Sequence, residues 1–553
     1  MPIPVPCLAA RVAEGAARRD GSITFVGSDP ALAVRVPWAE LHADALAMAG
    51  TLQARGVGPG AHVALLGPTS RPLVTAIQAT WLAGGTVMVL PLPMRIGSIE
   101  ELVAQTRARI RGVDAALVLV DADLAPFVSP EPGDPPFSTF GDVTGGHHPF
   151  AVPEADPDRL AILQFTSGAT ADPKGVMLTH RQVVANLAGV AESARLDPDS
   201  DVTMSWLPLY HDMGLIGLLT LSMITGTDLV QASPLDFLAA PARWMEWMSH
   251  YGGTATAGPN FAYAVAARRL VAQSGLDLSR VRIALNGAEP VHAETVSDFL
   301  AAGALHGLAP GAAFPAFGMA EVAIAGTFPE PGRGLCLDVV DRRALEHDRV
   351  AEPRSPGGAE VRAMARLGRP VSGLEMRICD AATGDVLAER QAGELQLRGT
   401  SVTSGYYRHP QATADAFDGD WLRTGDLGYT ADGELVVCGR IKDVIIVAGR
   451  NVFPEDVEHA ASGVAGVRAG NVIAFGIDGG GRATEEVVVV AESRGDDHAA
   501  VRRAVAARIL DTVGLPPGDI VLVQPGTLPK TSSGKLQRAL CRRRYLDAAL
   551  QTV

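Results

Sequence analysis

The sequence predicts an α/β protein. Its large N-terminal domain would have two α/β subdomains with mainly parallel sheets and a small β-barrel-like subdomain, and a small α+β domain would follow. Three observations predict this: helix and strand patterns alternate up to about Leu300, short alternating strands follow Gly368, and a mixed pattern begins at Arg440. With 553 residues, the chain is long enough for several hydrophobic cores.

The first βαβ pattern lies between Trp38 and Leu90. Its expected elements are a helix over 38–55, a strand over 62–66, a helix over 71–83 and a strand over 86–90. Gly56 and the pair Gly84-Gly85 end the two helices. The same order of patterns returns from Leu160, which favours parallel strands joined by helices.

Residues 126–158 are rich in Pro, Gly and Asp and include Pro135-Pro136. This composition predicts an irregular connection between two sheets. The longest apolar stretch, Gly214 to Ile224, contains Thr and Ser and is shorter than the roughly 20 residues that a bilayer span needs. We therefore expect a buried helix there and no integral membrane association.

The last third of the chain divides into two parts. Turn signals at Asp418-Gly419 and Asp432-Gly433 favour a β-rich subdomain. The next predicted elements are a helix from 454, strands near 472–475 and 486–490, and a helix over 497–513. We place a boundary at 439–442, which gives domains 1–439 and 440–553.

Composition excludes several classes of function. The net charge of −14 opposes non-specific binding of nucleic acid or of an anionic membrane. The five cysteines are scattered and lack C-x-x-C spacing, so we expect neither a disulfide framework nor a zinc site, and reduced thiols in a cytoplasmic protein. No basic segment precedes an apolar stretch near the N-terminus, so no secretory signal is expected.

Lysine is rare among the 47 basic residues. The four lysines are Lys174, Lys442, Lys530 and Lys535, and all lie in Gly-rich or Gly-flanked segments. A compact, mobile ammonium is chemically distinct from a guanidinium. Codon bias together with chance is the alternative explanation of this count.

Residues 163–175 read Leu-Gln-Phe-Thr-Ser-Gly-Ala-Thr-Ala-Asp-Pro-Lys-Gly, after a predicted strand and before a helix that begins near His180. Hydroxyls, small residues and a lysine suit phosphate oxygens, although the spacing is not that of a Walker A loop. An ordinary polar turn is the alternative. The candidate phosphate ligands are Thr166, Ser167, Gly168, Thr170 and Lys174.

This T-S-G-x-T-x-x-P-K-G pattern resembles the phosphate loop of the adenylate-forming superfamily. Five further segments resemble superfamily motifs and occur in the family's order: Gly287-Ala288-Glu289-Pro290, Phe317-Gly318-Met319-Ala320-Glu321, Trp421-Leu422-Arg423-Thr424-Gly425-Asp426, Gly439-Arg440-Ile441-Lys442-Asp443 and Pro529-Lys530-Thr531-Ser532-Ser533-Gly534-Lys535. The resemblance spans nearly the whole chain.

Within the superfamily, three stretches resemble fatty acyl-AMP ligases in particular: 205–217 (SWLPLYHDMGLIG), 258–263 (GPNFAY) and 286–291 (NGAEPV). The 47 positions from Glu321 to Gly368 are compatible with the insertion that marks these enzymes. The resemblance implies that ATP, with Mg²⁺, activates a fatty or related carboxylic acid to an acyl-adenylate and releases pyrophosphate. It further implies acyl transfer to the phosphopantetheine of an acyl carrier protein or carrier domain, generally without free coenzyme A.

The resemblance assigns catalytic roles by position. Lys535 would bridge the carboxylate and the α-phosphate, a cation placed where two anions must meet; a solvated loop lysine is the alternative. His211 would line the entry of the carboxylate, which is already ionised at neutral pH and needs no base; core packing is its alternative. Glu321 would hold Mg²⁺, unless it is an exposed carboxylate at a helix start.

The nucleotide-binding roles follow in the same way. The adenine pair would be Gly287 to Pro290 with Phe317, Gly318 and Met319, where Phe317 stands in place of the family's usual stacking Tyr. Asp426 would accept both ribose hydroxyls, or only form an Asx-type turn. Arg440 would reach ribose or phosphate, or be a structural surface arginine.

The hinge motif also carries an expectation about movement. Lys442 would be the hinge of a mobile C-terminal domain, with an ordinary linker lysine as the alternative. Lys530 would neutralise phosphate or only cap its loop. Trp206, Met213, Phe261 and Met319 are candidates for the wall of the acyl tunnel.

Two positions depart from the family's pattern. Ala169 and Ala171 stand where fatty acyl-AMP ligases often have Ser and Gly, which removes a hydroxyl and reduces backbone freedom. Two alternatives to a fatty acyl-AMP ligase therefore stay open. One is an acyl-CoA or aryl-CoA synthetase, which shares every adenylation motif. The other is a weakened adenylate-fold protein that binds ligands as a sensor or scaffold.

Overall fold

The computed structural model describes residues 7–18, 21–92, 99–146, 148–165, 174–358, 360–479, 484–531 and 534–553. The first α/β subdomain is built on a six-stranded sheet with the order β6-β5-β3-β4-β7-β8, parallel except for β8. Its strands are β3 (His62–Leu66), β4 (Thr86–Val89), β5 (Ala115–Val120), β6 (Phe137–Thr139), β7 (Leu160–Phe165) and β8 (Gly175–Thr179). Its helices are α2 (Trp38–Ala54), α3 (Arg71–Ala83), α4 (Ile99–Gly112) and α5 (Phe140–Val143).

Local signals set the ends of α3, as the sequence predicts. The Ser70 hydroxyl accepts a hydrogen bond from the Leu73 N–H at 3.4 Å and caps the first turn. Gly84 ends the helix with a φ of +90°, which glycine adopts without strain. Trp81 is buried and donates from Nε1 to the Ala161 carbonyl at 2.9 Å, so the helix is fastened to β7.

The interpretation of 126–158 as a connection between two sheets is wrong. After β6 and α5 the chain returns to the same sheet, where β7 pairs with β4 in parallel. Proline and glycine show where a loop runs, but the free edge of β4 decides which sheet the next strand joins. The sequence analysis also missed β8, which pairs antiparallel with β7 before helix α6 (His180–Ser193).

The second subdomain contains a seven-stranded sheet with the order β13-β12-β11-β9-β10-β1-β2, in which only β2 is antiparallel. Its strands are β1 (Ser22–Val26), β2 (Val34–Pro37), β9 (Val202–Ser205), β10 (Asp228–Ala232), β11 (Ala255–Gly258), β12 (Ile283–Asn286) and β13 (Ala313–Pro315). Helices of this region are α1 (Leu8–Ala17), α8 (Pro234–Ala239), α9 (Arg243–His250), α10 (Asn260–Leu270) and α11 (Ala293–Ala304). The buried helix predicted over 214–224 is confirmed as the π-helix η3 (Met213–Thr220), which continues into α7 (Leu221–Thr225).

A β-rich region follows, but it begins at Phe317 and not after Gly368 as predicted. Its antiparallel sheets are β14-β15-β18, β16-β17 and β19-β20-β22-β21, the last joined by β23 on β22. The bounds are β14 (Phe317–Gly318), β15 (Ala325–Phe328), β16 (Leu337–Asp341), β17 (Val361–Ala365), β18 (Arg369–Pro370), β19 (Leu374–Cys379), β20 (Gly393–Gly399), β21 (Phe417–Asp418), β22 (Trp421–Ala431) and β23 (Glu434–Arg440), with helix α12 (Pro410–Asp415).

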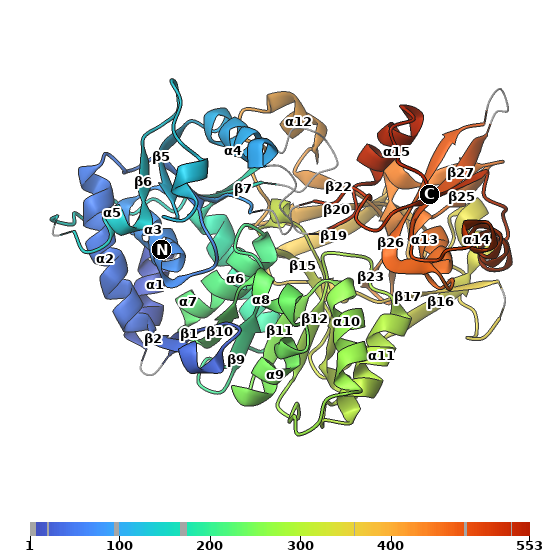
Figure 1. The fold of residues 1–553 in the computed structure, drawn as a ribbon, viewed down its shortest axis with the longest axis horizontal. Coiled ribbons are helices and arrows are strands. Elements are labelled where there is room, and N and C mark those ends of the chain that lie inside the picture. Colours follow the sequence, from blue (N-terminus) through green and yellow to red (C-terminus); the bar gives the residue numbers. More distant parts are fainter. Residues whose placement is uncertain are drawn as a thin grey trace.

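The C-terminal part, residues 440–553, is an α+β unit with its own hydrophobic core (Figure 1). Its elements are β24 (Ile445–Val447), β25 (Arg450–Val452), α13 (Pro454–Ser462), β26 (Val467–Asp478), β27 (Glu485–Ser493), α14 (His498–Val513), β28 (Asp519–Val523) and α15 (Arg538–Leu546). Two ion pairs join it to the 321–368 segment: Arg450 Nε to Glu346 Oε2 at 2.5 Å, and Arg362 Nε to Asp456 Oδ2 at 3.1 Å.

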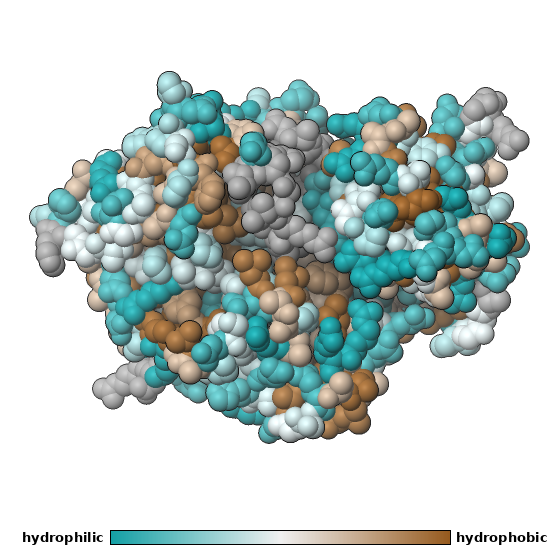
Figure 2. Space-filling model, in the orientation of Figure 1, coloured by the Kyte–Doolittle hydropathy of each residue, from teal (hydrophilic) through white to brown (hydrophobic). Residues whose placement is uncertain are grey.

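In the described ranges, none of the helices has the length and apolar composition needed to cross a bilayer. On the face shown in Figure 2, hydrophobic side chains form separate small groups among hydrophilic ones. All five cysteines are free, and Cys379, Cys438 and Cys541 are buried.

Candidate active site

A cleft of about 2910 Å³ is lined by side chains of both the N-terminal part and the C-terminal unit. It brings together every predicted site residue in the described part of the chain: Lys174, His211, Gly287, Ala288, Glu289, Pro290, Phe317, Gly318, Met319, Glu321, Asp426, Arg440, Lys442 and Lys535. The predictions for Thr166, Ser167, Gly168 and Thr170, and for Ala169 and Ala171, lie outside the described residues.

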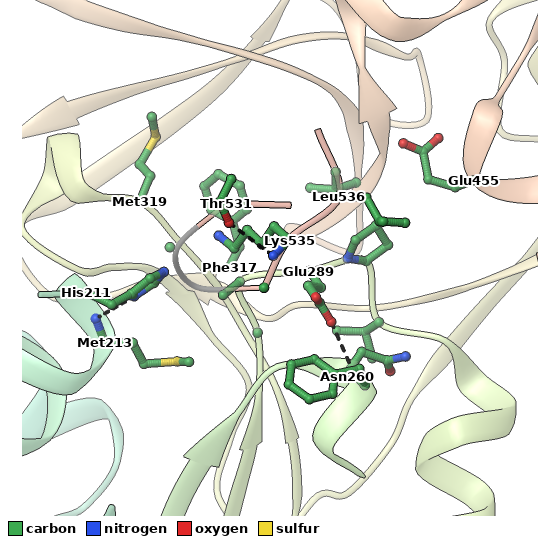
Figure 3. Close-up of a pocket in the computed structure, with 18 of the residues that line it drawn as sticks. His211, Met213, Asn260, Glu289, Phe317, Met319, Glu455, Thr531, Lys535 and Leu536 are labelled. Carbon is green, nitrogen blue, oxygen red and sulfur yellow. Dashed lines mark hydrogen bonds between the residues drawn. The ribbon is translucent and has the colours of Figure 1, made fainter. Parts of the chain in front are cut away.

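Lys535 reaches this cleft from a short loop of the C-terminal unit. The loop is closed by two hydrogen bonds: the Lys535 N–H donates to Thr531 Oγ1 at 3.0 Å, and the Thr531 N–H donates to the Lys535 carbonyl at 2.8 Å. Figure 3 shows Lys535 in the same part of the cleft as Phe317 and Glu289. A lysine from one part of the chain therefore faces groups from the other.

His211 lies across the cleft and pairs with its neighbour. Its Nδ1 is 2.6 Å from Asp212 Oδ1, and the same oxygen accepts the Met213 N–H at 2.7 Å. Burial alone would raise the pKa of Asp212, but the charges of His211 and Lys535 outweigh burial, so the pKa is lowered. His211 is thus held in place by an ionised neighbour, in keeping with its predicted role at the carboxylate entry.

The two segments predicted to bind adenine pack closely against neighbouring backbone and line the cleft. A Cβ on Gly318 would lie 2.0 Å from the Ile324 carbonyl oxygen, and one on Gly287 would lie 3.1 Å from that of Ala316. Both glycines allow a close approach of backbone that a side chain would prevent. Phe317 lines the cleft at this point and can stack on a base.

Glu289 lines the cleft in the first of these two segments. Its Oε2 accepts the Phe261 N–H at 3.1 Å. Burial raises the pKa of Glu289, although this hydrogen bond and the charge of Lys535 oppose the rise. Ala288 beside it has a φ of +66°, a backbone conformation that costs energy in a residue other than glycine.

Asp426 carries an oxygen that fits a hydroxyl donor. Asp426 and Arg440 are opposite each other in the register of β22 and β23, and Arg440 Nε lies 2.8 Å from Asp426 Oδ1. Asp426 Oδ2 is buried and has no hydrogen-bond partner. Burial raises the pKa of Asp426 to about 6, with the charge of Arg440 opposing it. A ribose hydroxyl donating to Oδ2 would relieve this unsatisfied acceptor.

This pKa predicts how nucleoside binding depends on pH. A hydroxyl donates best to the ionised carboxylate, so affinity for adenosine, which has no phosphate to titrate, should fall as the pH drops through about 6. Well below this pKa, the affinity should fall by about tenfold for each pH unit. Titration calorimetry at several pH values measures it. Asp426→Asn should bind weakly with little pH dependence, and a flat profile in the wild type would contradict the assignment.

Glu321 is held by a residue that the sequence analysis missed. The Tyr406 hydroxyl donates to Glu321 Oε1 at 2.9 Å, and the Thr403 N–H donates to the Glu321 carbonyl at 2.7 Å. The Tyr406 ring centroid lies 4.9 Å from Lys174 Nζ. Tyr406 therefore connects the predicted metal-binding carboxylate to the lysine of the phosphate loop.

The donor set around Glu321 fits Mg²⁺ bound mainly by phosphate. The described residues contain no group of three or more His, Cys, Asp or Glu that could hold a metal ion. Mg²⁺ in nucleotide sites typically takes one or two carboxylates and completes its shell with water and phosphate. One buried carboxylate, oriented by Tyr406, meets that need.

Removing the Tyr406 hydroxyl should therefore weaken metal binding. In Tyr406→Phe, we expect the affinity for Mn²⁺ in the presence of a non-hydrolysable ATP analogue to fall about tenfold, a typical effect of losing a partner that orients a metal ligand. Electron paramagnetic resonance of free Mn²⁺ measures it. Tyr407→Phe is the matched control, because the Tyr407 ring packs on His62 instead. Equal affinity in both variants would contradict this role.

The start of α15 forms a second cluster that the sequence analysis missed. Arg538 pairs with Asp443, and its Nη2 lies 2.9 Å from Glu458 Oε1 and 3.4 Å from Glu455 Oε1. Asp443 follows Lys442 in the short helix η7 (Ile441–Asp443) that leads out of β23. The loop that carries Lys535 is therefore attached to the predicted hinge.

Part of the cleft is lined by apolar side chains, and we call this part the apolar extension. Residues from several elements line it, among them Leu218, Ala257, Ile283, Phe314 and Phe328. Three of the four candidates for the tunnel wall, Met213, Phe261 and Met319, line the cleft. Trp206 is instead buried and stacked on Phe237 with ring centroids 3.7 Å apart, because these aromatics pack into the core beside α9.

Comparison with known proteins gives the family. The model of the AMP-binding enzyme family matches residues 13–407. The chain belongs to this family. The adenylate-forming resemblance seen in the motifs is thereby confirmed.

Individual relatives refine this result. Rv1013 of Mycobacterium tuberculosis, provisionally named a ligase, is 40% identical over 94% of this chain and 96% of its own length. A protein of Caulobacter vibrioides that is provisionally named an acyl-CoA synthetase is 35% identical over 92% and 90%. The long-chain-fatty-acid–AMP ligase FadD26 of Mycobacterium bovis is 33% identical over 94% and 93%.

Two further comparisons concern acyl activation directly. The medium-chain-fatty-acid–[acyl-carrier-protein] ligase JamA of Moorena producens is 35% identical over 72% of this chain and 70% of its own. A solved structure from work on fatty acyl-adenylate ligases of E. coli and L. pneumophila superposes with a TM-score of 0.91 at 31% identity, over 99% of this chain and 98% of that one. The chain is thus a member of the fatty acyl-AMP ligase group, with the large N-terminal and small C-terminal domains of adenylate-forming enzymes.

Proposed function

We propose that the protein activates a fatty or related carboxylic acid with ATP and passes the acyl group to an acyl carrier protein. In the first step a carboxylate oxygen attacks the α-phosphorus of ATP, pyrophosphate leaves and an acyl-adenylate forms. In the second step the phosphopantetheine thiol attacks the acyl carbonyl, its proton is lost to solvent and AMP leaves. One observation carries the proposal: Lys535 of the C-terminal unit lines the same cleft as Phe317 and as Asp426, which has an unsatisfied oxygen.

Each residue has a defined task in the first step. Lys535 bridges the attacking carboxylate and the α-phosphate and lowers the repulsion between two anions. Asp426 orients the ribose through Oδ2, and Phe317 stacks on adenine. Glu321 would hold Mg²⁺, which neutralises charge on the phosphates when bound.

The acyl chain occupies the apolar extension of the cleft. His211, held by Asp212, directs the carboxylate toward the α-phosphate. Leu218, Ile283 and Phe314 offer an apolar wall to a hydrocarbon chain. These features favour a fatty acid over a polar carboxylate.

The second step requires Lys535 to leave. The proposed domains are 1–439 and 440–553, with Lys442 at the hinge between β23 and β24. Rotation about this point would withdraw the Lys535 loop and open the acyl-adenylate to the thiol. The carrier acceptor is favoured by the similarity to JamA, named as an acyl-carrier-protein ligase.

A direct test is to incubate the protein with ATP, Mg²⁺ and medium- or long-chain fatty acids, and to follow pyrophosphate and acyl-AMP by mass spectrometry. We expect stoichiometric pyrophosphate and an acyl-AMP that stays bound. Absence of pyrophosphate with every carboxylate tested would reject the enzyme and favour the binding or scaffold protein left open by Ala169 and Ala171.

A further inference from the structure

Helix α4 carries three arginines at alternate positions, and they do not share one environment. Arg107 Nε lies 3.0 Å from Asp134 Oδ2, and Arg111 Nε lies 2.7 Å from Asp134 Oδ1. Arg107 also reaches Glu131 at 2.9 Å. These two arginines lie on the same face of the helix, since they are four residues apart, and both are satisfied by carboxylates.

Arg109 points to the other side and has no carboxylate. It lines the cleft, with its guanidinium carbon 5.9 Å from the centre of the Phe165 ring. Its Nε is buried without a hydrogen-bond partner, and the described residues offer Arg109 no ion pair. Burial lowers the pKa of Arg109, which shows that its charge is poorly solvated there.

A buried guanidinium nitrogen without a hydrogen-bond partner costs free energy in a protein that has no ligand for it. Its surroundings indicate what that ligand is. Phe165 ends β7 opposite Gly175 of β8, Lys174 precedes Gly175, and Phe165 and Lys174 line the same cleft as Arg109. Arg109 and Lys174 are thus two of the many cations that border the cleft, and both are next to Phe165. The planar fork of a guanidinium matches the oxygens of a phosphate group.

We propose that Arg109 is the core of a phosphate subsite in the wall of the cleft. This inference rests on the proposed function, which brings two sources of phosphate to the cleft. One is the triphosphate tail of ATP, later released as pyrophosphate. The other is the phosphodiester of the phosphopantetheine arm of the carrier.

Titration of the full-length protein with inorganic pyrophosphate tests the first source without turnover. We expect Arg109→Gln to bind pyrophosphate at least about tenfold more weakly than the wild type, and Arg109→Lys to recover part of the loss. Arg107→Gln is the matched control from the same helix, and it should bind pyrophosphate like the wild type because its partners are Asp134 and Glu131.

Thermal stability separates a ligand site from a structural role. Without ligand, Arg109→Gln should melt at the same temperature as the wild type or higher, since it removes a buried nitrogen that has no partner, whereas Arg107→Gln should melt lower because it loses its ion pairs. A melting temperature of Arg109→Gln as low as that of Arg107→Gln, with unchanged pyrophosphate binding, would overturn the proposal.

Transfer from preformed acyl-adenylate to a holo carrier protein tests the second source. If Arg109→Gln binds pyrophosphate normally but has a raised KM for the carrier, the subsite receives the phosphopantetheine phosphate. If neither pyrophosphate binding nor the carrier KM changes, there is no such subsite. These readouts stand apart from the proposed function, whose own failure would appear as a wild type that forms no acyl-adenylate.

Discussion

Lys535→Ala is expected to form acyl-adenylate about 10²–10³-fold more slowly than the wild type, the usual effect of removing a preorganised donor that stabilises developing charge. The Lys535 loop is closed by its own backbone contacts to Thr531, and these do not need the side chain. Nucleotide affinity should therefore stay measurable. Single-turnover formation of acyl-AMP, followed by mass spectrometry, measures the rate, and titration with AMP measures binding.

A charge-matched control comes from the same C-terminal unit. Arg542 donates from Nε to the Gly476 carbonyl at 2.9 Å and does not line the cleft. Arg542→Ala also removes one positive charge, and we expect its rate to stay within about twofold of the wild type. A Lys535→Ala variant with wild-type turnover would remove Lys535 from the mechanism.

Arg538→Met should have the largest effect on stability. The arginine faces the half-buried carboxylates of Asp443, Glu455 and Glu458, and its loss removes the ion pair that each of them makes with it. Breaking such a cluster typically lowers the free energy of unfolding by about 3–5 kcal/mol. Denaturant unfolding of the full chain, read by hydrogen exchange within residues 440–553, measures the change, and Arg542→Met is the control.

The pH dependence of the free energy of unfolding is a second test of the role of Arg538. Burial raises the pKa of Glu458 to about 7, although Arg538 opposes the rise, so the charged form of Glu458 is already unfavourable in the folded state. Protonated Glu458 contributes to the stability of the fold at low pH, and this contribution is lost as the pH rises through about 7 and the carboxyl ionises. Without Arg538 this pKa rises further, so the difference between variant and wild type should grow with pH. A constant difference would contradict the ion cluster.

Local signals made much of the fold predictable from sequence. The ends of α3 follow from Ser70 and Gly84, and the boundaries of β3 and β4 follow from short apolar runs beside them. The path after residue 126 was not predictable, because strand pairing depends on a free sheet edge far away in sequence. The strand β8 is short and directly follows the candidate phosphate loop. The polar residues of that loop made the strand pattern after it difficult to recognise.

The same limit applies to the site. Motifs placed Asp426 and Arg440 near the nucleotide, but only the register of β22 and β23 makes them a pair. Tyr406 lies 85 residues from Glu321, and Arg538 lies 95 from Asp443. No periodicity links such positions. The only local signal for a role of Tyr406 was the pair of adjacent tyrosines after Gly405. The only local signal for Arg538 was its position just after the Lys535 loop.

The four lysines show both what the sequence predicts and what it leaves open. Lys174, Lys442, Lys530 and Lys535 all line the cleft, so the few lysines of this arginine-rich chain gather at one place. Their individual roles depend on contacts with ligands, and these stay predictions. Codon bias can explain why arginine replaces lysine elsewhere, but not why the remaining lysines meet here.

The central claim is that the acyl group goes from the adenylate to a carrier protein. A competition measures this most directly: wild-type protein carrying preformed acyl-AMP is mixed with equal concentrations of holo carrier protein and free coenzyme A, and the products are quantified by mass spectrometry. We predict acyl-carrier as the main product and little acyl-CoA. Rapid and dominant formation of acyl-CoA would contradict the account and make the protein an acyl-CoA synthetase.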